Sequence, residues 1–375
     1  MQQVMAAVKV GPGRTEVHEF PLPDVPPEAG LLRIEAAGVC GSDVGSYPRP
    51  THHGQPHVMG HENVGRIVKL GREAAARWGL REGDRVALEE YLPCGACAWC
   101  YSSDFRLCDK TDVHRADAVR YGLTPTSVAP AIWGGFAEYL YLHPNSVFHM
   151  VPEHVPAEQA ALALPLGNGW EWAYVEGGAA PGKTVLIQGP GQQGLGCVIA
   201  AKEANAACII VSGLTQDTER LAVARALGAD HTIDAQTEDL RERVLALTDG
   251  RGVDVVIDVA AASEATLVPA IDLLKKRGTL VVPAGRMEQT TDHFPIGKMK
   301  VKYLTLKAVR GHSYHAVERA LEIIASGRYP MDRLCSHQFG VAQTDEAIRT
   351  AAGERGPGAV HVSVVPGAAA HAPGT

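Results

Sequence analysis

The pattern of apolar positions changes near residue 156 of this 375-residue chain. Before that point, short apolar runs stand between Gly, Pro and other turn residues. Such runs occupy positions 31–34, 64–68 and 85–88. Runs of this length, bounded by turn residues, are typical of short strands. We therefore predict an irregular, mainly β domain over residues 1–155.

After residue 156, unbroken apolar runs alternate with helical segments. The predicted strands are 184–188, 208–212, 231–234, 254–259, 279–283 and 303–308. The predicted helices are 157–175, 194–204, 219–227, 237–248 and 263–274. Strands made of β-branched runs such as TVLI and VVIDV are buried on both faces, and their alternation with helices indicates βαβ units. The sequence thus predicts an α/β fold with a doubly wound parallel sheet over residues 156–309.

The remaining residues, 310–375, contain one clear helical pattern at 314–326 and are expected to return to the first domain. A net charge of −7 argues against nucleic acid as a partner. No apolar run reaches 18 residues, and the N-terminus lacks the apolar core of a signal peptide. We expect a protein without a membrane partner, located in the cytoplasm.

A glycine-rich loop follows the predicted strand at 184–188 and precedes an apolar helix. It reads GPGQQG, which is the pattern G-x-G-x-x-G. The first glycine permits a tight turn, the second lets a pyrophosphate approach the backbone, and the third lets helix and strand pack closely. Phosphate oxygens would bind the free N–H groups at the start of the helix. The predicted dinucleotide-binding residues of this loop are Gly189, Gly191, Gln192, Gln193 and Gly194.

The second strand of this domain bears on the choice of dinucleotide. NAD sites usually place an acidic residue at its end to bind the ribose hydroxyls, but Ser212 and Gly213 stand there. Basic residues that would bind the phosphate of NADP are also missing from the positions that follow directly. Asp217 could reach the ribose of NAD and Arg220 the phosphate of NADP, and solvated loop charges are the alternative interpretation of both. On balance the sequence favours NAD(H) over NADP(H).

Four of the eight cysteines lie within one short segment; they are Cys94, Cys97, Cys100 and Cys108. Four thiolates from one loop suit the closed tetrahedral shell of a structural zinc ion. A small, evenly cysteine-rich disulfide scaffold does not fit this clustering. An iron–sulfur cluster is the rival interpretation, because it also uses four close cysteines. We predict a structural zinc site, which the segment needs because its apolar content is low.

Three further candidate ligands lie in the β-rich part of the chain. Cys40 stands in the segment GVCGSD, and His61 and Glu62 belong to a Gly-His-Glu segment. A catalytic zinc ion uses three protein ligands and leaves a fourth position for water or substrate. Taken alone, these three residues also fit ordinary core and loop positions.

The order of these motifs resembles that of one family. GVCGSD, GHE, the four-cysteine segment, GGFAEY and the glycine loop follow one another as in the zinc-dependent medium-chain alcohol dehydrogenases. The polyol (sorbitol) and threonine dehydrogenase branches look most similar, and the resemblance extends from about residue 5 to 365. It implies a GroES-like catalytic domain over 1–155 and 310–375 and a Rossmann domain over 156–309. It also implies an active site in the cleft between them and a homo-oligomer, either a dimer or a tetramer.

The resemblance implies roles for single residues as well. Cys40 and His61 would bind a catalytic zinc ion. Asp43 would orient the ring of His61, and Ser42 would pass on the proton of the substrate.

The chain departs from the family pattern at two positions. The usual third zinc ligand is replaced by Leu164, which cannot bind a metal, and Glu62 is the expected substitute. Relatives often carry a relay histidine where this chain has Gly45. The histidines that could stand in for it are His52, His53 and His57.

The predicted reaction transfers hydride between an alcohol and a nicotinamide, with a ketone or aldehyde as the product. Trp133, Asn168 and Trp170 are candidate pocket residues, together with Trp172, and the tryptophans favour an apolar or aromatic small-molecule substrate. Two other functions stay open. Without the catalytic zinc, the enzyme would reduce the C=C bond of an enone. Without any chemistry, the chain would be a non-catalytic nucleotide-binding protein.

Overall fold

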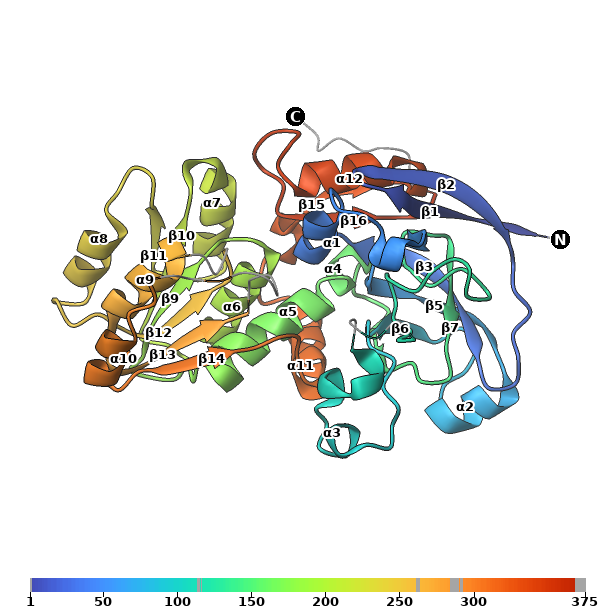
Figure 1. Cartoon of the computed structure of the whole chain (residues 1–375), viewed down its shortest axis with the longest axis horizontal. Coiled ribbons are helices and arrows are strands. Elements are labelled where there is room, and N and C mark those ends of the chain that lie inside the picture. The colour runs from blue at the N-terminus through green and yellow to red at the C-terminus, as the bar shows by residue number, and fades with distance from the viewer. Residues whose placement is uncertain are drawn as a thin grey trace. The chain divides into compact units, whose positions relative to one another are not determined.

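The computed structural model of the chain (Figure 1) describes residues 2–112, 115, 117–260, 264–283, 290 and 293–367. The chain divides into two compact units, of which the first contains Met1–Leu164 and Leu321–Thr375 and the second contains Pro165–Ala320. Both boundaries fall within helices, namely α5 (Ala163–Trp170) and α11 (Tyr314–Ala325). In the part of the chain that is described, no helix is long and apolar enough to cross a membrane.

The first unit is built on a seven-stranded sheet with the order β15-β16-β3-β5-β6-β8, in which β7 pairs with β3. Its strands are β3 (Gly30–Gly38), β5 (Glu62–Leu70), β6 (Arg85–Leu88), β7 (Tyr139–Leu142), β8 (Phe148–Met150), β15 (Cys335–Phe339) and β16 (His361–Val364). A smaller sheet has the order β2-β1-β4, formed by β1 (Gln3–Gly11), β2 (Arg14–Pro21) and β4 (His57–Val58). Because β16 pairs with β3, the C-terminal part of the chain completes the N-terminal sheet.

Short helices lie between these strands. They are α1 (Gly41–Ser46), α2 (Arg72–Trp78), α3 (Ala98–Tyr101), α4 (Ala157–Ala160) and α12 (Thr344–Ala351). The core contains inward-facing strand residues such as Leu32 and Val86, the ring of Phe136, and Ile348 of α12. This packed core holds the ends of the strands, and therefore the loops that connect them, in fixed positions.

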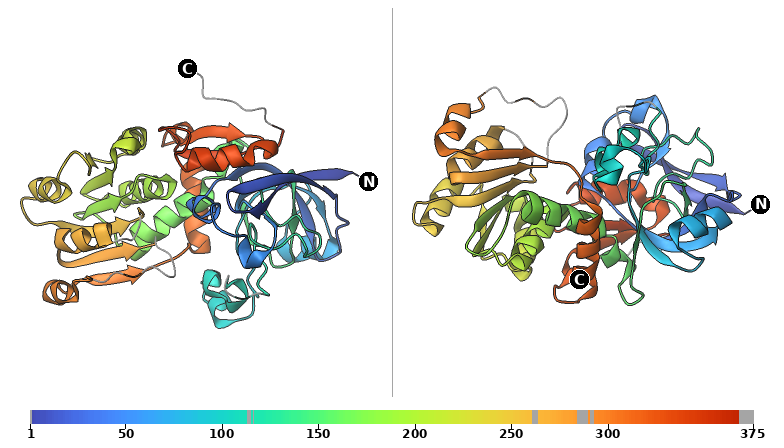
Figure 2. Two further views of the ribbon diagram at one scale, coloured as in Figure 1. Left: turned by 45° about the horizontal axis from the view of Figure 1, so that its top comes forward. Right: turned by 90° about the horizontal axis from the view of Figure 1, so that it is seen from below.

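The second unit contains a six-stranded sheet in which every strand pair is parallel. Its order is β11-β10-β9-β12-β13-β14, from β9 (Thr184–Gln188), β10 (Cys208–Gly213), β11 (His231–Asp234), β12 (Val253–Asp258), β13 (Leu274–Val282) and β14 (Thr305–Ala308). The helices are α6 (Gln192–Glu203), α7 (Thr218–Ala226), α8 (Leu240–Leu247), α9 (Glu264–Leu273) and α10 (Ile296–Lys302). Helices lie on both sides of the sheet (Figure 2), which confirms the predicted doubly wound α/β fold.

The prediction of one continuous helix over 157–175 is wrong. The structure has α4, then α5, then a π-helical turn over Glu171–Glu176. Pro165 lacks an N–H, and its ring would clash with the carbonyl of Ala161 in one continuous helix. Gly169 then lets α5 approach α6 closely, since a Cβ there would lie 2.2 Å from the carbonyl carbon of Gly196.

Candidate functional site

Three donor groups meet in the first unit. Cys40 immediately precedes α1, His61 precedes β5, and Glu62 is the first residue of β5. One donor atom from each of the three lies within 4.8 Å of the other two. Thiolate, imidazole and carboxylate are ligands that zinc takes in catalytic sites, where three protein donors leave one position open. The donor set therefore fits a catalytic zinc ion.

Two neighbours contact the ring of His61 from opposite nitrogens. Asp43, buried in the first turn of α1, accepts a hydrogen bond from the Cys40 N–H at 3.0 Å and has its other carboxylate oxygen 3.6 Å from His61 Nδ1. Ser42 is exposed, and its Oγ lies 3.3 Å from His61 Nε2. A carboxylate on one ring nitrogen orients the other toward a metal. The structure thus brings together all five residues predicted for the catalytic group.

An ion pair that the sequence analysis missed also reaches this ring. Glu90 follows β6, and one of its carboxylate oxygens lies 3.9 Å from His61 Nε2. Its other oxygen lies 2.6 Å from the guanidinium of Arg120. A β-bridge between Tyr91 and Arg120 brings the two segments together. This pairing is not visible in the sequence, because the two charges are far apart in the chain and Arg120 lies outside any periodic element.

Burial and neighbouring charges shift the pKa values of the three donor groups. Burial raises the pKa of the Cys40 thiol, and the neighbouring Glu62 raises it further. Burial also raises the pKa of Glu62, to about 8. For His61, burial opposes the charged ring, but Asp43 and Glu90 outweigh it and raise the pKa well above its ordinary value. Adjacent buried acids ionise together only when a positive charge lies between them, and a divalent metal ion supplies that charge.

The structure shows the contacts of the residues at which the chain departs from the family pattern, and of the residues predicted to replace them. Leu164 is buried in the first turn of α5, and Glu62 occupies the place beside Cys40 and His61. The rings of His52 and His53 lie against each other, with centroids 4.1 Å apart. His57 is buried in β4, with Nδ1 3.2 Å from the carbonyl of Gln55.

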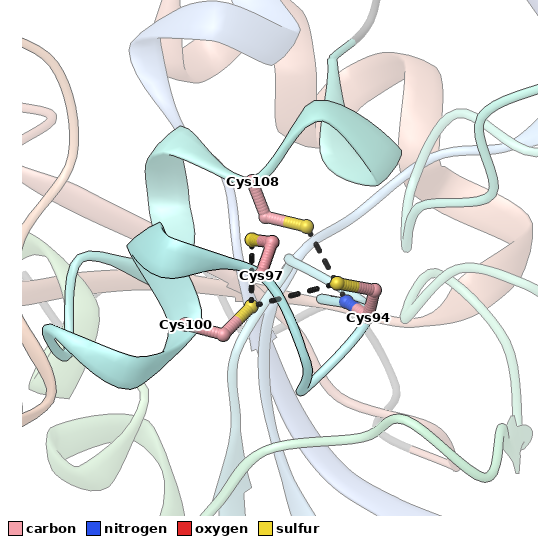
Figure 3. A group of neighbouring side chains, drawn as sticks. All are labelled: Cys94, Cys97, Cys100 and Cys108. Atoms are coloured by element: carbon pink, nitrogen blue, oxygen red, sulfur yellow. Dashed lines mark hydrogen bonds between the residues drawn. The ribbon is translucent and has the colours of Figure 1, made fainter.

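The four clustered cysteines converge on one point (Figure 3). One Sγ atom from each lies within 4.8 Å of the other three. The Sγ of Cys100 is 3.9 Å from that of Cys94 and 3.5 Å from that of Cys97. A tetrahedral zinc ion with bonds of about 2.3 Å separates its sulfur ligands by about 3.8 Å. An iron–sulfur cluster distributes its cysteines over several iron atoms and so holds the sulfurs farther apart, which favours a single zinc ion.

The glycine loop has the geometry that a phosphate site needs. Gly189 has a φ of +105°, which permits the turn after β9. Gly191 is the N-cap of α6, and a Cβ there would meet nothing within 4 Å. A Cβ on Gly194 would lie 1.9 Å from the carbonyl oxygen of Gly189, so only glycine lets α6 pack here. Gln192 and Gln193 form the first turn of α6, the end of a helix whose backbone N–H groups and dipole favour an anion.

The charged residues after β10 contact each other. Asp217 is buried and accepts a hydrogen bond from the Leu214 N–H at 3.0 Å. The guanidinium of Arg220 lies 3.2 Å from its other oxygen. A second carboxylate, which the sequence analysis missed, belongs to Asp234 at the end of β11 and accepts a hydrogen bond from Thr215 at 2.7 Å. Ser212 and Gly213 are buried within the strand end itself.

The candidate pocket residues all have packing partners. Trp133 is buried in the core of the first unit, and its Nε1 donates to the carbonyl of Val128 at 2.9 Å. Asn168 lies 2.9 Å from His312 Nδ1. The guanidinium of Arg319 lies over the ring of Trp170, 5.2 Å from its centroid. Trp172 is buried and donates to the carbonyl of Gly311 at 3.0 Å. Each side chain thus has a structural role, and lining of a pocket stays a prediction.

A doubly wound sheet with this loop binds a dinucleotide, and an open three-donor zinc site polarises an oxygen. The class that these features define is a zinc-dependent dehydrogenase. Residues 26–153 match the family model "Alcohol dehydrogenase GroES-like domain", and residues 194–326 match "Zinc-binding dehydrogenase".

Individual proteins are similar over nearly the whole chain. A Mycobacterium tuberculosis protein named "Probable alcohol dehydrogenase adh" is 37% identical over 94% of this chain and 95% of its own length. An "Erythritol/L-threitol dehydrogenase" of Mycolicibacterium smegmatis is 30% identical over 97% of this chain and 98% of its own. The crystal structure of an alcohol dehydrogenase from Thermotoga maritima has a TM-score of 0.84 at 24% identity, covering 98% of this chain and 100% of that chain. The chain belongs to the zinc-dependent medium-chain alcohol dehydrogenases, which are NAD(P)-dependent oxidoreductases of alcohols.

Proposed function

We propose that this enzyme exchanges hydride between NAD(H) and an alcohol or ketone, with a catalytic zinc ion held by Cys40, His61 and Glu62. The observation that carries the proposal is the convergence of these three donors within 4.8 Å, although the usual third ligand position is Leu164. When bound, zinc supplies a Lewis acid that lowers the pKa of an alcohol, and the nicotinamide accepts the hydride.

The residues of the chain orient the ligands and move the proton. Asp43 lies on the Nδ1 side of the His61 ring, which leaves Nε2 to bind the metal ion. Ser42 Oγ, 3.3 Å from Nε2, accepts the proton of the substrate hydroxyl and passes it to water. Because Ser42 is exposed, this route needs no relay histidine, which agrees with Gly45 at the usual position.

The preference for NAD(H) is supported by the charges beyond β10. The positive charge of Arg220 is paired with Asp217, and Asp234 adds a second carboxylate. The three side chains together carry a net negative charge, which opposes the additional phosphate of NADP.

We also propose a cytoplasmic homo-oligomer, a dimer or a tetramer. All eight cysteines are free thiols, as a reducing compartment favours. Strand β14 lies at the end of the six-stranded sheet. Leu306 of this strand and Tyr303, two residues before the strand, expose large apolar side chains. An open, apolar sheet edge is a suitable surface for a second copy.

Cofactor reduction with a panel of secondary, polyol, aromatic and terpenoid alcohols, using NAD+ and NADP+ side by side, tests the proposal. We expect turnover with NAD+ and about two zinc ions per chain, one for each donor group. The panel also tests the predicted apolar or aromatic substrate.

The second candidate function is the zinc-free enone reductase, which Leu164 favours. One zinc ion per chain together with enone reduction would replace the proposal with this function. Cofactor binding without any turnover would indicate a non-catalytic protein.

A further inference from the structure

One lysine side chain is buried in the first unit and has no part in the reaction described so far. Lys9 lies in β1, and only 1% of its surface is exposed. Its Nζ donates a hydrogen bond to the carbonyl of Ser46 at 2.7 Å and to the carbonyl of Pro50 at 3.4 Å. Ser46 is the last residue of α1, and Pro50 lies in the loop that follows. The lysine therefore joins β1 to the C-terminal end of α1.

The helix α1 needs such support from another element. It has only six residues, with the sequence GSDVGS, and so short a helix is unstable by itself. Glycine and serine are also poorer helix formers than alanine or leucine. The last turn of α1 has no basic residue of its own, and the last carbonyls of a helix have no partner within the helix. A lysine at this end satisfies one of these carbonyls and places its positive charge at the negative end of the helix dipole.

The surroundings of the buried amino group show which element it serves. An amino group removed from water is unfavourable unless other groups compensate. Burial lowers the pKa of Lys9 and Arg49 lowers it further, whereas Asp43 raises it. The groups that favour the ammonium here are thus Asp43 and the carbonyls of Ser46 and Pro50, and all of them belong to α1 or the loop after it.

The same helix carries polar groups next to His61. Cys40 is the N-cap of α1, and Ser42 and Asp43 lie in its first turn. Ser42 is exposed, so packing does little to hold it, and its Oγ lies 3.3 Å from His61 Nε2. A shift of about 0.3 Å would take this pair beyond hydrogen-bonding distance. Because a helix this short moves as one piece, a restraint at Ser46 also fixes its first turn.

We propose that Lys9 is a positioning residue, which holds the C-terminal end of α1 and thereby keeps Ser42 Oγ in place to accept the proton of the substrate hydroxyl. This inference rests on the proposed function, in which Ser42 receives that proton.

A double-mutant cycle of Lys9→Met and Ser42→Ala tests whether Lys9 acts through Ser42. Methionine keeps most of the apolar stem of lysine but donates no hydrogen bond. We expect Lys9→Met to lower kcat about tenfold, with both zinc ions and the affinity for NAD(H) retained. The double variant should be no slower than Ser42→Ala alone, because a residue that acts only through Ser42 has no effect in its absence. Lys69→Met, which changes an exposed lysine of β5, is the matched control and should keep the kcat of the wild type.

The solvent deuterium isotope effect on kcat separates positioning from a general loss of stability. It should rise in Lys9→Met as it does in Ser42→Ala, because a misplaced acceptor makes proton transfer limit turnover. A variant whose fold is merely weakened has fewer active molecules but an unchanged isotope effect. Lys9→Gln retains an N–H donor and should show smaller effects, and it takes the place of Lys9→Met in the cycle if the methionine variant does not fold.

Amide hydrogen exchange gives a readout that does not depend on turnover. Exchange over residues 41–47 should be at least tenfold faster in Lys9→Met than in the wild type, with exchange in β6 unchanged. Unchanged exchange in α1, or effects of Lys9→Met and Ser42→Ala on kcat that multiply, would overturn the proposal. Failure of the proposed function is distinct, since the wild type would then oxidise no alcohol of the panel while exchange in α1 still depended on Lys9.

Discussion

At the scale of single residues, two glycines leave the space that the donor group needs. Gly38 pairs with Glu62 across β3 and β5. A Cβ on Gly38 would lie 2.3 Å from a carboxylate oxygen of Glu62 and 2.7 Å from Cε1 of His361. Gly60, which precedes His61, has a φ of +89°, and a Cβ there would lie 2.6 Å from the ring of Phe136. Glycine at these two positions therefore leaves the room in which the side chains of Glu62 and Phe136 lie.

The substitution Gly38→Ala should displace Glu62 from the donor group. We expect the catalytic zinc ion to bind at least tenfold more weakly, with the four-cysteine zinc ion retained and alcohol oxidation reduced in proportion to the lost metal. Metal analysis after dialysis against a mild chelator measures this. Gly11→Ala is the control, since a Cβ there meets nothing within 4 Å. Full zinc retention in Gly38→Ala would contradict the assignment of Glu62 as a ligand.

His57 links stability to pH. Burial lowers its pKa from 6.5 to about 4, so the fold favours the neutral ring while the unfolded chain binds a proton below pH 6.5. This contribution is fully present above pH 6.5 and is lost as the pH falls to about 4, and it amounts to roughly 3 kcal/mol.

Thermal unfolding of the wild type and of His57→Gln at pH 7 and at pH 4.5 tests this contribution. The melting temperature of the wild type should fall more steeply on acidification than that of the variant, because glutamine has no proton to gain. Parallel decreases in the two proteins would show that His57 does not titrate in this way.

At the scale of elements, two glycines at the start of α6 have different roles. Gly194 is needed for packing, because a Cβ would lie 1.9 Å from the Gly189 carbonyl oxygen, whereas Gly191 faces open space. Gly194→Ala should therefore destabilise the protein by about 1–3 kcal/mol. Gly191→Ala should fold normally but bind NAD(H) at least tenfold more weakly, because its methyl group occupies the approach of the pyrophosphate. Thermal unfolding and cofactor titration separate these effects, and unchanged cofactor affinity in Gly191→Ala would exclude this helix terminus as the phosphate site.

We expect the four-cysteine segment to depend on a bound metal ion more than on packing. Trp99 and Leu107 are exposed, and Phe105 is buried. Cys97→Ala should lose one zinc ion, lower the melting temperature by several degrees and make this segment sensitive to proteases, while the remaining folded enzyme keeps its kcat. Zinc content, thermal unfolding and limited proteolysis check this result. A variant that lacks the metal but is as stable as the wild type would show that zinc has no structural role there.

The elements differed in how well their sequence predicted them. β9 and β11 have the predicted bounds. The continuous apolar run of β9 is typical of a strand buried on both faces, whereas β11 has only one fully buried residue, Ile233. β15 and β16 were not predicted, since CSHQF and HVSV mix polar and apolar residues without a clear pattern. Their pairing with the N-terminal sheet comes from contacts between distant parts of the chain, which local patterns do not contain.

At the scale of the whole molecule, contacts between distant parts of the chain also limited how much of the site could be predicted from the sequence. The four cysteines were recognisable because short spacing is itself a local pattern. Cys40, His61 and Glu62 were proposed from family resemblance rather than from spacing, and Glu90 and Arg120 were missed. The contact between Glu90 and Arg120 depends on the bridge of Arg120 to Tyr91, just after β6, which only the complete fold determines.

The most direct test of the account compares the wild type with Cys40→Ala for zinc content, NAD(H) affinity and alcohol oxidation. We expect two zinc ions per chain in the wild type and one in the variant, which loses alcohol oxidation by at least a thousandfold but binds NAD(H) as before. Alcohol oxidation that persists in Cys40→Ala at the wild-type rate would contradict catalysis by a zinc ion at this site.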